Sequence, residues 1–150
     1  MTEKIKIWCD GGSRNNGKPN NIGGWAFLLT YKSHILSKSG HAYNTTNNEQ
    51  ELTALINALK QIKTTDIPII VYSDSQYVIK GLTEWRKGWE SRNWLNAQKK
   101  PVANKELWIE LFGLHDKQSM IEYKWVKGHS DDEGNNFVDR LLNEEMDKHS

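Results

Sequence analysis

Apolar and polar positions alternate over the opening segment of the chain, residues 4–10. A period of two residues is typical of a β-strand with one buried face. The stretch 10–17 is rich in glycine and asparagine and predicts a turn. Two further apolar runs, 23–31 and 35–41, follow with short polar breaks between them. These segments predict three strands joined as an antiparallel meander.

The apolar period changes after Thr46. From Leu52 to Ile62 the apolar residues recur at spacings of 3, 1, 3 and 3 residues, which is typical of one face of a helix. Thr46 and Glu49 fit a capping box, in which each side chain accepts a hydrogen bond from the backbone amide of the other. A helix is therefore expected to begin at Thr46.

The second half of the chain alternates strand and helix patterns. The near-continuous apolar run 67–72 predicts a strand that is buried on both faces. Helices are expected over 75–85, about 104–114 and about 135–147, with another strand at 121–126. The order βββαβααβα predicts a mixed α/β fold in a single domain.

Composition limits the class of protein. A chain of 150 residues is long enough to bury a core as one domain without disulfides. The one cysteine, Cys9, indicates a reduced compartment, and we expect a cytoplasmic protein. No apolar run approaches the roughly 18 residues of a membrane span. Seven Trp, five Tyr and three Phe exclude a disordered chain.

Charge is distributed unevenly along the chain. The net charge of +1 argues against a generic nucleic-acid coat protein. The segment from Lys80 to Lys105, however, contains seven basic and two acidic residues, whereas the segment from Asp131 to Ser150 contains seven acidic and two basic residues. The chain thus has a basic segment and an acidic segment.

Four acidic residues are candidates for chemistry. Asp10 and Asp74 each follow a strand that is predicted to be buried, and ligands gather at the carboxyl ends of strands in α/β sheets. Glu51 lies near the edge of the apolar stripe of its helix, and Asp139 lies in the first turns of the last helix. Each also has a simpler explanation. Asp10 can start a turn, and Asp74 can be a helix N-cap. Glu51 can be a surface glutamate, and Asp139 can complement the helix dipole.

The four acids have a restricted chemistry if they meet. Four neighbouring carboxylates cannot all stay ionised without a compensating cation. Ligation by oxygen alone favours Mg²⁺ or Mn²⁺. A pair of such ions suits phosphoryl chemistry, because one activates water while the other stabilises the leaving oxygen.

At these residues the chain resembles the type 1 ribonuclease H family, which cleaves the RNA strand of RNA-DNA hybrids with divalent metal. The matching segments cover nearly the whole chain. They are CDGGS at 9–13, TTNNEQEL at 45–52, YSDSQYVIKGLTEW at 72–85, KKPVANKELW at 99–108, WVKGHS at 125–130, and Asn135 followed by Asp139.

The resemblance implies a ribonuclease H-like α/β fold. The expected mixed sheet has five strands, of which the first three are antiparallel and the last two run parallel to the first. Helices flank both faces, and a basic helical handle is expected at about 85–103. The whole chain, 1–150, is expected to be one catalytic domain without a separate hybrid-binding domain.

The resemblance also implies the catalytic residues. Its carboxylates fall on Asp10, Glu51, Asp74 and Asp139, which are expected to hold two Mg²⁺ ions, with Mn²⁺ as a possible substitute. Its mobile histidine falls on His129, where an imidazole can relay a proton near neutral pH. The other four histidines are expected to be solvated surface groups.

The substrate implied by the resemblance is an RNA-DNA hybrid. Side-chain amides can both donate to and accept from the 2′-hydroxyl that distinguishes RNA, while aromatic and basic residues are expected along the DNA strand. The expected substrate-binding residues are Asn16, Thr46, Asn47, Asn48, Gln76, Tyr77, Trp85, Lys99, Lys100, Asn104 and Asn135. For Trp89, Trp94 and Trp108, packing within the handle is expected. We expect a monomer that requires no protein partner and no membrane.

Three other functions fit parts of the sequence less well. Residues 12–18 fit the start of a phosphate-binding P-loop, but Pro19 stands where that motif needs Ser or Thr, which excludes it. A metal-dependent nuclease or strand-transfer enzyme acting on DNA is disfavoured by Asn47 and Asn48 and by the compact length. A non-catalytic hybrid-binding module gains nothing from clustered acids, because phosphate affinity comes from Lys and Arg.

Overall fold

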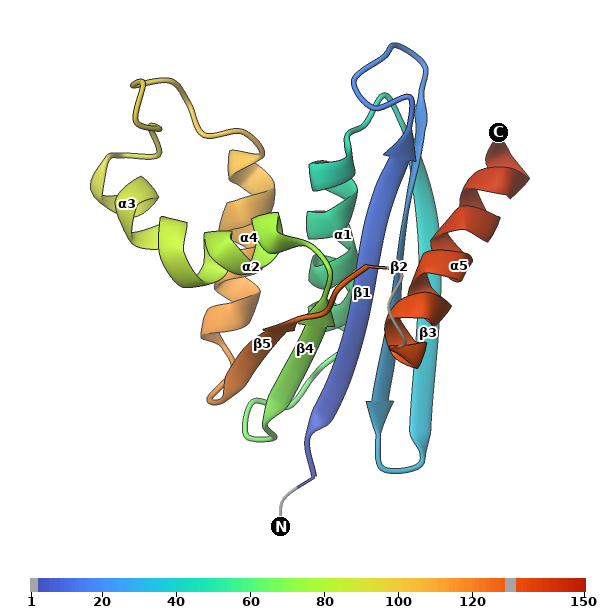
Figure 1. Cartoon of the computed structure of the whole chain (residues 1–150). Helices are drawn as coiled ribbons and strands as arrows, with labels where there is room; N and C mark the ends of the chain where they lie inside the picture. Colours follow the sequence, from blue (N-terminus) through green and yellow to red (C-terminus); the bar gives the residue numbers. More distant parts are fainter. Residues whose placement is uncertain (1–2, 129–131) are drawn as a thin grey trace.

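The computed structural model describes residues 3–128 and 132–150, which form a mixed five-stranded sheet in the order β3-β2-β1-β4-β5 (Figure 1). The first three strands pair antiparallel, and β4 and β5 extend the sheet parallel to β1. The strands are β1 (Ile5–Arg14), β2 (Ile22–Tyr31), β3 (His34–Tyr43), β4 (Ile69–Ser73) and β5 (Ile121–Trp125). The predicted α/β fold and strand directions are confirmed.

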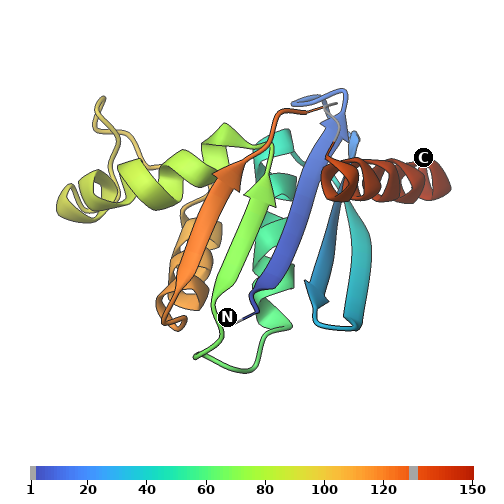
Figure 2. The same cartoon turned by 60° about the horizontal axis from the view of Figure 1, so that its bottom comes forward.

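Helices cover both faces of the sheet. α1 (Asn47–Lys60) and α4 (Lys105–Asp116) lie on one face, and α5 (Glu133–His149) lies on the other (Figure 2). Among the described residues, no helix is long and apolar enough to cross a membrane.

Two hydrophobic cores hold the layers together. The larger lies between the sheet, α1 and α4 and contains Ile7, Leu55 and Trp108, each with no exposed surface. The smaller lies under α5, where Val138 and Leu142 pack on the opposite face of the sheet. The apolar stripes predicted from the sequence therefore face these two cores.

A helical arm extends from the end of the sheet. It runs through α2 (Gln76–Lys80), the π-helical turn η1 (Gly81–Trp85) and α3 (Arg86–Ser91), and it projects away from the strands in Figure 1. Trp108 joins the arm to the core, because a Cβ added at Gly81 would lie 2.0 Å from its ring. Trp108 is thus a core residue that also packs against Trp89, as the expected packing with the handle requires.

The turn expected at residues 10–17 begins later than predicted. β1 continues to Arg14, because it stays paired with β2 up to the register position Arg14–Ile22. Asp10 therefore lies within a strand, and a turn does not explain its presence.

The helix caps also differ in part from the prediction. The Thr46 hydroxyl accepts from the backbone amide of Glu49 at 3.1 Å, which confirms the N-cap of α1. The Glu49 carboxylate instead accepts from the Thr45 hydroxyl at 3.3 Å. At α2 the N-cap is Ser75, whose hydroxyl accepts from the amide of Val78. The N-cap explanation for Asp74 is therefore wrong.

Candidate active site

Three of the predicted carboxylates meet at one end of the sheet. Asp10 lies on β1, Asp74 directly follows β4, and Glu51 lies on α1; one carboxylate oxygen of each is within 4.8 Å of the others. The parallel register pairs Cys9 with Ser73, so that the residues following them are neighbours. The sheet topology thus brings together two acids that are 64 positions apart in the printed numbering, Asp10 and Asp74.

A glycine allows Glu51 to reach this cluster. A Cβ added at Gly11 would lie 2.3 Å from the backbone carbonyl carbon of Gln50. Because Gly11 has no side chain, α1 packs directly on β1, and the Glu51 carboxylate accepts a hydrogen bond from the Gly11 amide. The close approach of helix and strand therefore positions the third carboxylate.

Burial and mutual repulsion set the electrostatics of the acidic cluster. Asp10 is 6% exposed and Glu51 is 9% exposed. Burial raises the pKa of Asp10 well above its ordinary value, and the charges of Glu51 and Asp74 raise it further. Burial also raises the pKa of Glu51, followed by the charge of Asp74. The fold thus holds carboxylates where their ionised forms are disfavoured unless a cation is present.

Asp139 lies across the same pocket. It projects from α5 and is half-buried, and it lines a cavity of about 460 Å³ together with Asp10, Glu51 and Asp74. It lies outside the group of three that share the 4.8 Å limit. Its charge nevertheless contributes to the raised pKa of Asp10. The four predicted acids therefore line one pocket, to which α5 contributes Asp139.

The donor set fits a hard divalent cation. The three clustered side chains offer only carboxylate oxygens, the ligands that Mg²⁺ and Mn²⁺ prefer. Arg14 also lines the pocket, but its guanidinium pairs with Asp147 at 2.7 Å. The positive charge of Arg14 is therefore already matched by an acid outside the cluster.

A groove lined by side-chain amides adjoins the acidic pocket. Asn47 and Asn48 line both cavities, and Asn16, Thr46 and Asn104 line the groove, whose volume is about 340 Å³. The side-chain oxygen of Asn16 accepts from the Asn47 amide at 2.8 Å. The side-chain oxygen of Asn47 accepts from the Ser13 amide at 2.7 Å. These bonds tie the end of β1 and the loop after it to the start of α1.

Aromatic residues continue this surface along the arm. The Tyr77 hydroxyl accepts from the Asn104 side chain at 3.2 Å and from the Trp108 indole at 3.0 Å. Trp85 packs edge-on against Tyr77 and stays 37% exposed. The structure thus joins Asn104 to Tyr77 and Trp85.

The remaining predicted residues are placed differently. Gln76, Lys99 and Lys100 are exposed and do not line the two cavities. Asn135 is 2% exposed, and its side-chain oxygen has no hydrogen-bond partner among the described residues. His129 lies outside the described residues.

The expectation of four surface histidines is wrong for His41 and His115, which are half-buried, whereas His34 and His149 are exposed. His34 is exposed, but the half-buried His115 ring contacts the Tyr123 hydroxyl at 2.8 Å. His41 and His149 both contact Glu145. The spacing of Glu145 and His149 along α5 was a signal for this pair, whereas His41 comes from a distant strand.

Comparisons with known proteins agree on one family. The RNase H family model matches residues 2–147. A protein named ribonuclease H from Ruthia magnifica subsp. Calyptogena magnifica is 46% identical over 145 residues, 97% of each chain. Another of that name, from Dichelobacter nodosus, is 44% identical and covers 93% of this chain and 89% of its own.

Solved structures show the same similarity in three dimensions. LC11-RNase H1 in complex with an RNA/DNA hybrid superposes with a TM-score of 0.74 at 25% identity, covering 97% of this chain and 99% of its own. The N-terminal RNase H domain of a Mycobacterium tuberculosis protein gives a TM-score of 0.73 at 26% identity, covering 98% and 96%.

Proposed function

The chain belongs to the ribonuclease H family, and from this premise we propose that it is an endonuclease that hydrolyses the RNA strand of RNA-DNA hybrids. The expected products are 3′-hydroxyl and 5′-phosphate ends. The observation that carries the proposal is the convergence of Asp10, Glu51 and Asp74 beside the amide-lined groove. The hybrid bound by LC11-RNase H1 supports the choice of substrate.

The acidic pocket is the proposed metal site. Asp10, Glu51, Asp74 and Asp139 would hold two Mg²⁺ ions, and Mn²⁺ could substitute. Mg²⁺ bound there supplies activation of the attacking water and stabilisation of the leaving oxygen. Once a cation is bound, the carboxylates remain ionised because it offsets their repulsion.

The groove and the arm are the proposed substrate surface. Asn16, Asn47, Asn48 and Gln76 contact the RNA strand through its 2′-hydroxyls, since amides can donate and accept. The DNA strand runs along the surface of Tyr77, Trp85 and Asn104, with Thr46 near a phosphate. Lys99 and Lys100, which follow the arm in the chain, and Asn135 are the remaining proposed substrate-binding residues. The protein acts as a monomer with a single catalytic domain over 1–150.

His129 is the proposed proton relay. An imidazole near the pocket can transfer a proton as the product leaves or as water enters. The variant His129→Ala is expected to slow turnover at saturating substrate and to leave hybrid affinity nearly unchanged. Equal losses of turnover and affinity would contradict this role.

The substrate test uses one labelled RNA in three forms. It is incubated with the protein and Mg²⁺ as an RNA-DNA hybrid, as an RNA duplex and as a single strand, with and without EDTA. We expect cleavage of the hybrid alone, and no cleavage with EDTA. Binding of the hybrid without cleavage, in Mg²⁺ and in Mn²⁺, would instead support a non-catalytic hybrid-binding module.

A further inference from the structure

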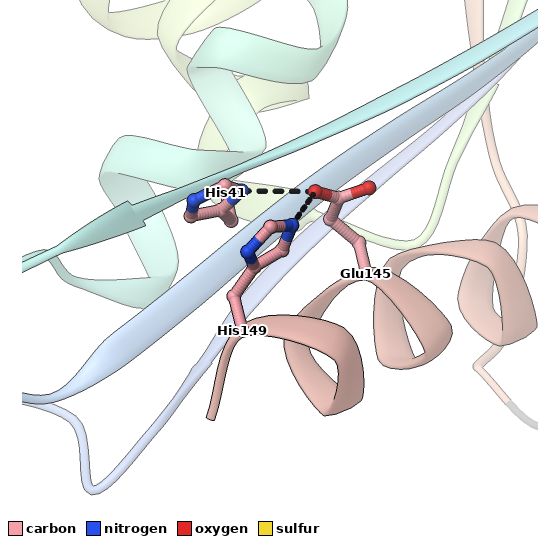
Figure 3. A group of neighbouring side chains, drawn as sticks. All are labelled: His41, Glu145 and His149. Carbon is pink, nitrogen blue, oxygen red and sulfur yellow. Dashed lines mark hydrogen bonds and ion pairs between the residues drawn. The ribbon is translucent and has the colours of Figure 1, made fainter.

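A second cluster of metal-ligating side chains lies on the opposite face of the sheet from α1. His41 on β3 and Glu145 and His149 on α5 converge, with one ligand atom of each within 4.8 Å of the others (Figure 3). Glu145 is only 14% exposed, whereas the two imidazoles are 29% and 39% exposed. The cluster is therefore held by the fold and still open to ions from solvent.

The ligand atoms have the spacing of one small coordination site. The Glu145 Oε2 atom is 2.9 Å from His41 Nδ1 and 3.2 Å from His149 Nε2. Tetrahedral zinc holds nitrogen and oxygen ligands at about 2.0–2.2 Å, which places neighbouring ligand atoms about 3.3 Å apart. The observed separations are close to this value before any side chain moves.

The two imidazole rings are stacked face to face beside the Glu145 carboxylate. Their rings stack with centroids 3.6 Å apart and an angle of 17° between planes. As Figure 3 shows, one nitrogen of each ring faces the same carboxylate oxygen of Glu145. A deprotonated imidazole nitrogen presents its lone pair in the plane of its ring, so one of the two nearly parallel rings turns for both lone pairs to point at a single ion.

Neighbouring groups fix the ligands in place. The Ser39 hydroxyl donates to the second carboxylate oxygen of Glu145 at 3.0 Å, and the Tyr43 hydroxyl donates to the backbone carbonyl of His149 at 2.9 Å. Such supporting contacts orient a metal ligand and keep it ionised.

We propose that His41, Glu145 and His149 bind one first-row transition-metal ion, with Zn²⁺ as the principal candidate. Two imidazole nitrogens and one carboxylate favour Zn²⁺, Ni²⁺ or Cu²⁺ over Mg²⁺, which prefers oxygen ligands. Water completes the coordination, because three protein ligands leave a position open. The site differs in donor chemistry from the acidic pocket, whose clustered ligands are all oxygens.

The ion joins the end of α5 to β3. α5 also carries Asp139 and lines the acidic pocket with Leu142, Asn143 and Met146. An ion that binds the folded chain and not the unfolded chain raises stability in proportion to the logarithm of its concentration over Kd. Zn²⁺ is therefore expected to raise the melting temperature by fixing the helix that forms one wall of the proposed active site.

The test is a calorimetric titration of the full chain with Zn²⁺ in the presence of excess Mg²⁺. An Asp10→Asn background is run in parallel, so that Zn²⁺ entering the acidic pocket is recognised as binding that this substitution weakens. We expect one Zn²⁺ per chain in both backgrounds. The double variant His41→Gln/His149→Gln is expected to lower the affinity more than about 100-fold, and Ser39→Ala about 10-fold.

A matched control comes from the same strand. His34 is exposed at the other end of β3, so His34→Gln removes a histidine without touching the cluster. We expect this variant to bind Zn²⁺ as the unchanged protein does, with the same rise in melting temperature. Unchanged Zn²⁺ affinity in the double variant, or Zn²⁺ binding that only Asp10→Asn abolishes, would overturn the proposal. Melting curves without metal verify that each variant is folded.

Discussion

Two clusters of three ionisable side chains stand out among the described residues, and they differ in how their charge is balanced. Asp10, Glu51 and Asp74 are all acids; burial and the charges of Glu51 and Asp74 raise the pKa of Asp10, and burial and the charge of Asp74 raise the pKa of Glu51. In the other cluster, Glu145 lies between two histidines, and its pKa is lowered. The first cluster is destabilised when it ionises, whereas hydrogen bonds stabilise the second without any added ion.

This difference separates a site that needs a cation from one that can accept one. Like charges held in a buried pocket reduce the stability of the metal-free fold. A protein keeps such an arrangement where function uses it, and the pocket beside the amide-lined groove is that place. The histidine cluster also links β3 to α5, so it has a structural role even when empty.

The largest expected effect comes from neutralising an acid of the first cluster. Glu51→Gln keeps the shape of the side chain and removes a ligand charge, so hybrid cleavage should fall by about 100-fold or more. Initial rates at saturating Mg²⁺ measure the effect. Glu144→Gln is the control, since it makes the same change at an exposed position of α5. Similar cleavage rates in Glu51→Gln and Glu144→Gln would contradict the claim that the first cluster is the catalytic one.

The next largest effect comes from the glycine that brings α1 onto β1. Gly11→Ala forces the helix backbone away from the strand, and we expect a loss of about 1–3 kcal/mol in the free energy of unfolding, with reduced cleavage. Gly113→Ala is the control, because a Cβ there would have no neighbour within 4 Å. Because Gly113 lies within α4, Gly113→Ala should increase the free energy of unfolding by at most about 1 kcal/mol. Denaturant unfolding compares the two variants.

The pH dependence of stability sharpens the contrast further. The raised pKa values of Asp10 and Glu51 mean that the native state binds more protons than the unfolded state above the ordinary carboxyl range of about pH 4. The metal-free protein should therefore lose stability as pH rises from about 5 to about 8, by at most about 1.4 kcal/mol per pH unit for each group. Saturating Mg²⁺ should flatten this slope. If stability fell equally steeply with pH with and without Mg²⁺, the assignment of Asp10 and Glu51 to the metal site would be contradicted.

The smallest expected effect lies in the histidine cluster. Glu145→Gln weakens the contacts with Ser39 and the two imidazoles. We therefore expect the free energy of unfolding without added metal to fall by about 0.5–1.5 kcal/mol. Thermal unfolding against Glu144→Gln measures it. A gain in stability would show that Glu145, like the acids of the first cluster, is poorly compensated.

The sequence predicts the fold well because its periods are clear. The alternation at residues 4–10, the helical spacing after Thr46 and the apolar run at 67–72 each correspond to an observed element. The boundaries are less predictable, since they depend on pairing partners. β1 continues to Arg14 because β2 is paired with it, and nothing in the local glycine-rich sequence indicates this.

The site is predictable where a motif identifies it and less so where tertiary contacts create it. Asp10, Asp74 and Glu51 each have a local explanation, and only the sheet register and the close packing at Gly11 show that they meet. The pairing of His41 with Glu145 has no local signal, because β3 and α5 are far apart in the chain. Such pairs follow from the fold and not from spacing.

The most direct test of the central claim is one variant measured in two ways. In the metal-free pocket Asp10 is kept protonated by its raised pKa, which costs stability at neutral pH; Asp10→Asn removes that cost together with the charge that the proposed cation needs. We predict that the metal-free variant is more stable than the unchanged protein at neutral pH, by about 1–3 kcal/mol, while cleavage of the hybrid in Mg²⁺ is lost. A variant that unfolds more easily and still cleaves the hybrid at nearly the original rate would contradict the claim that these carboxylates form the active site.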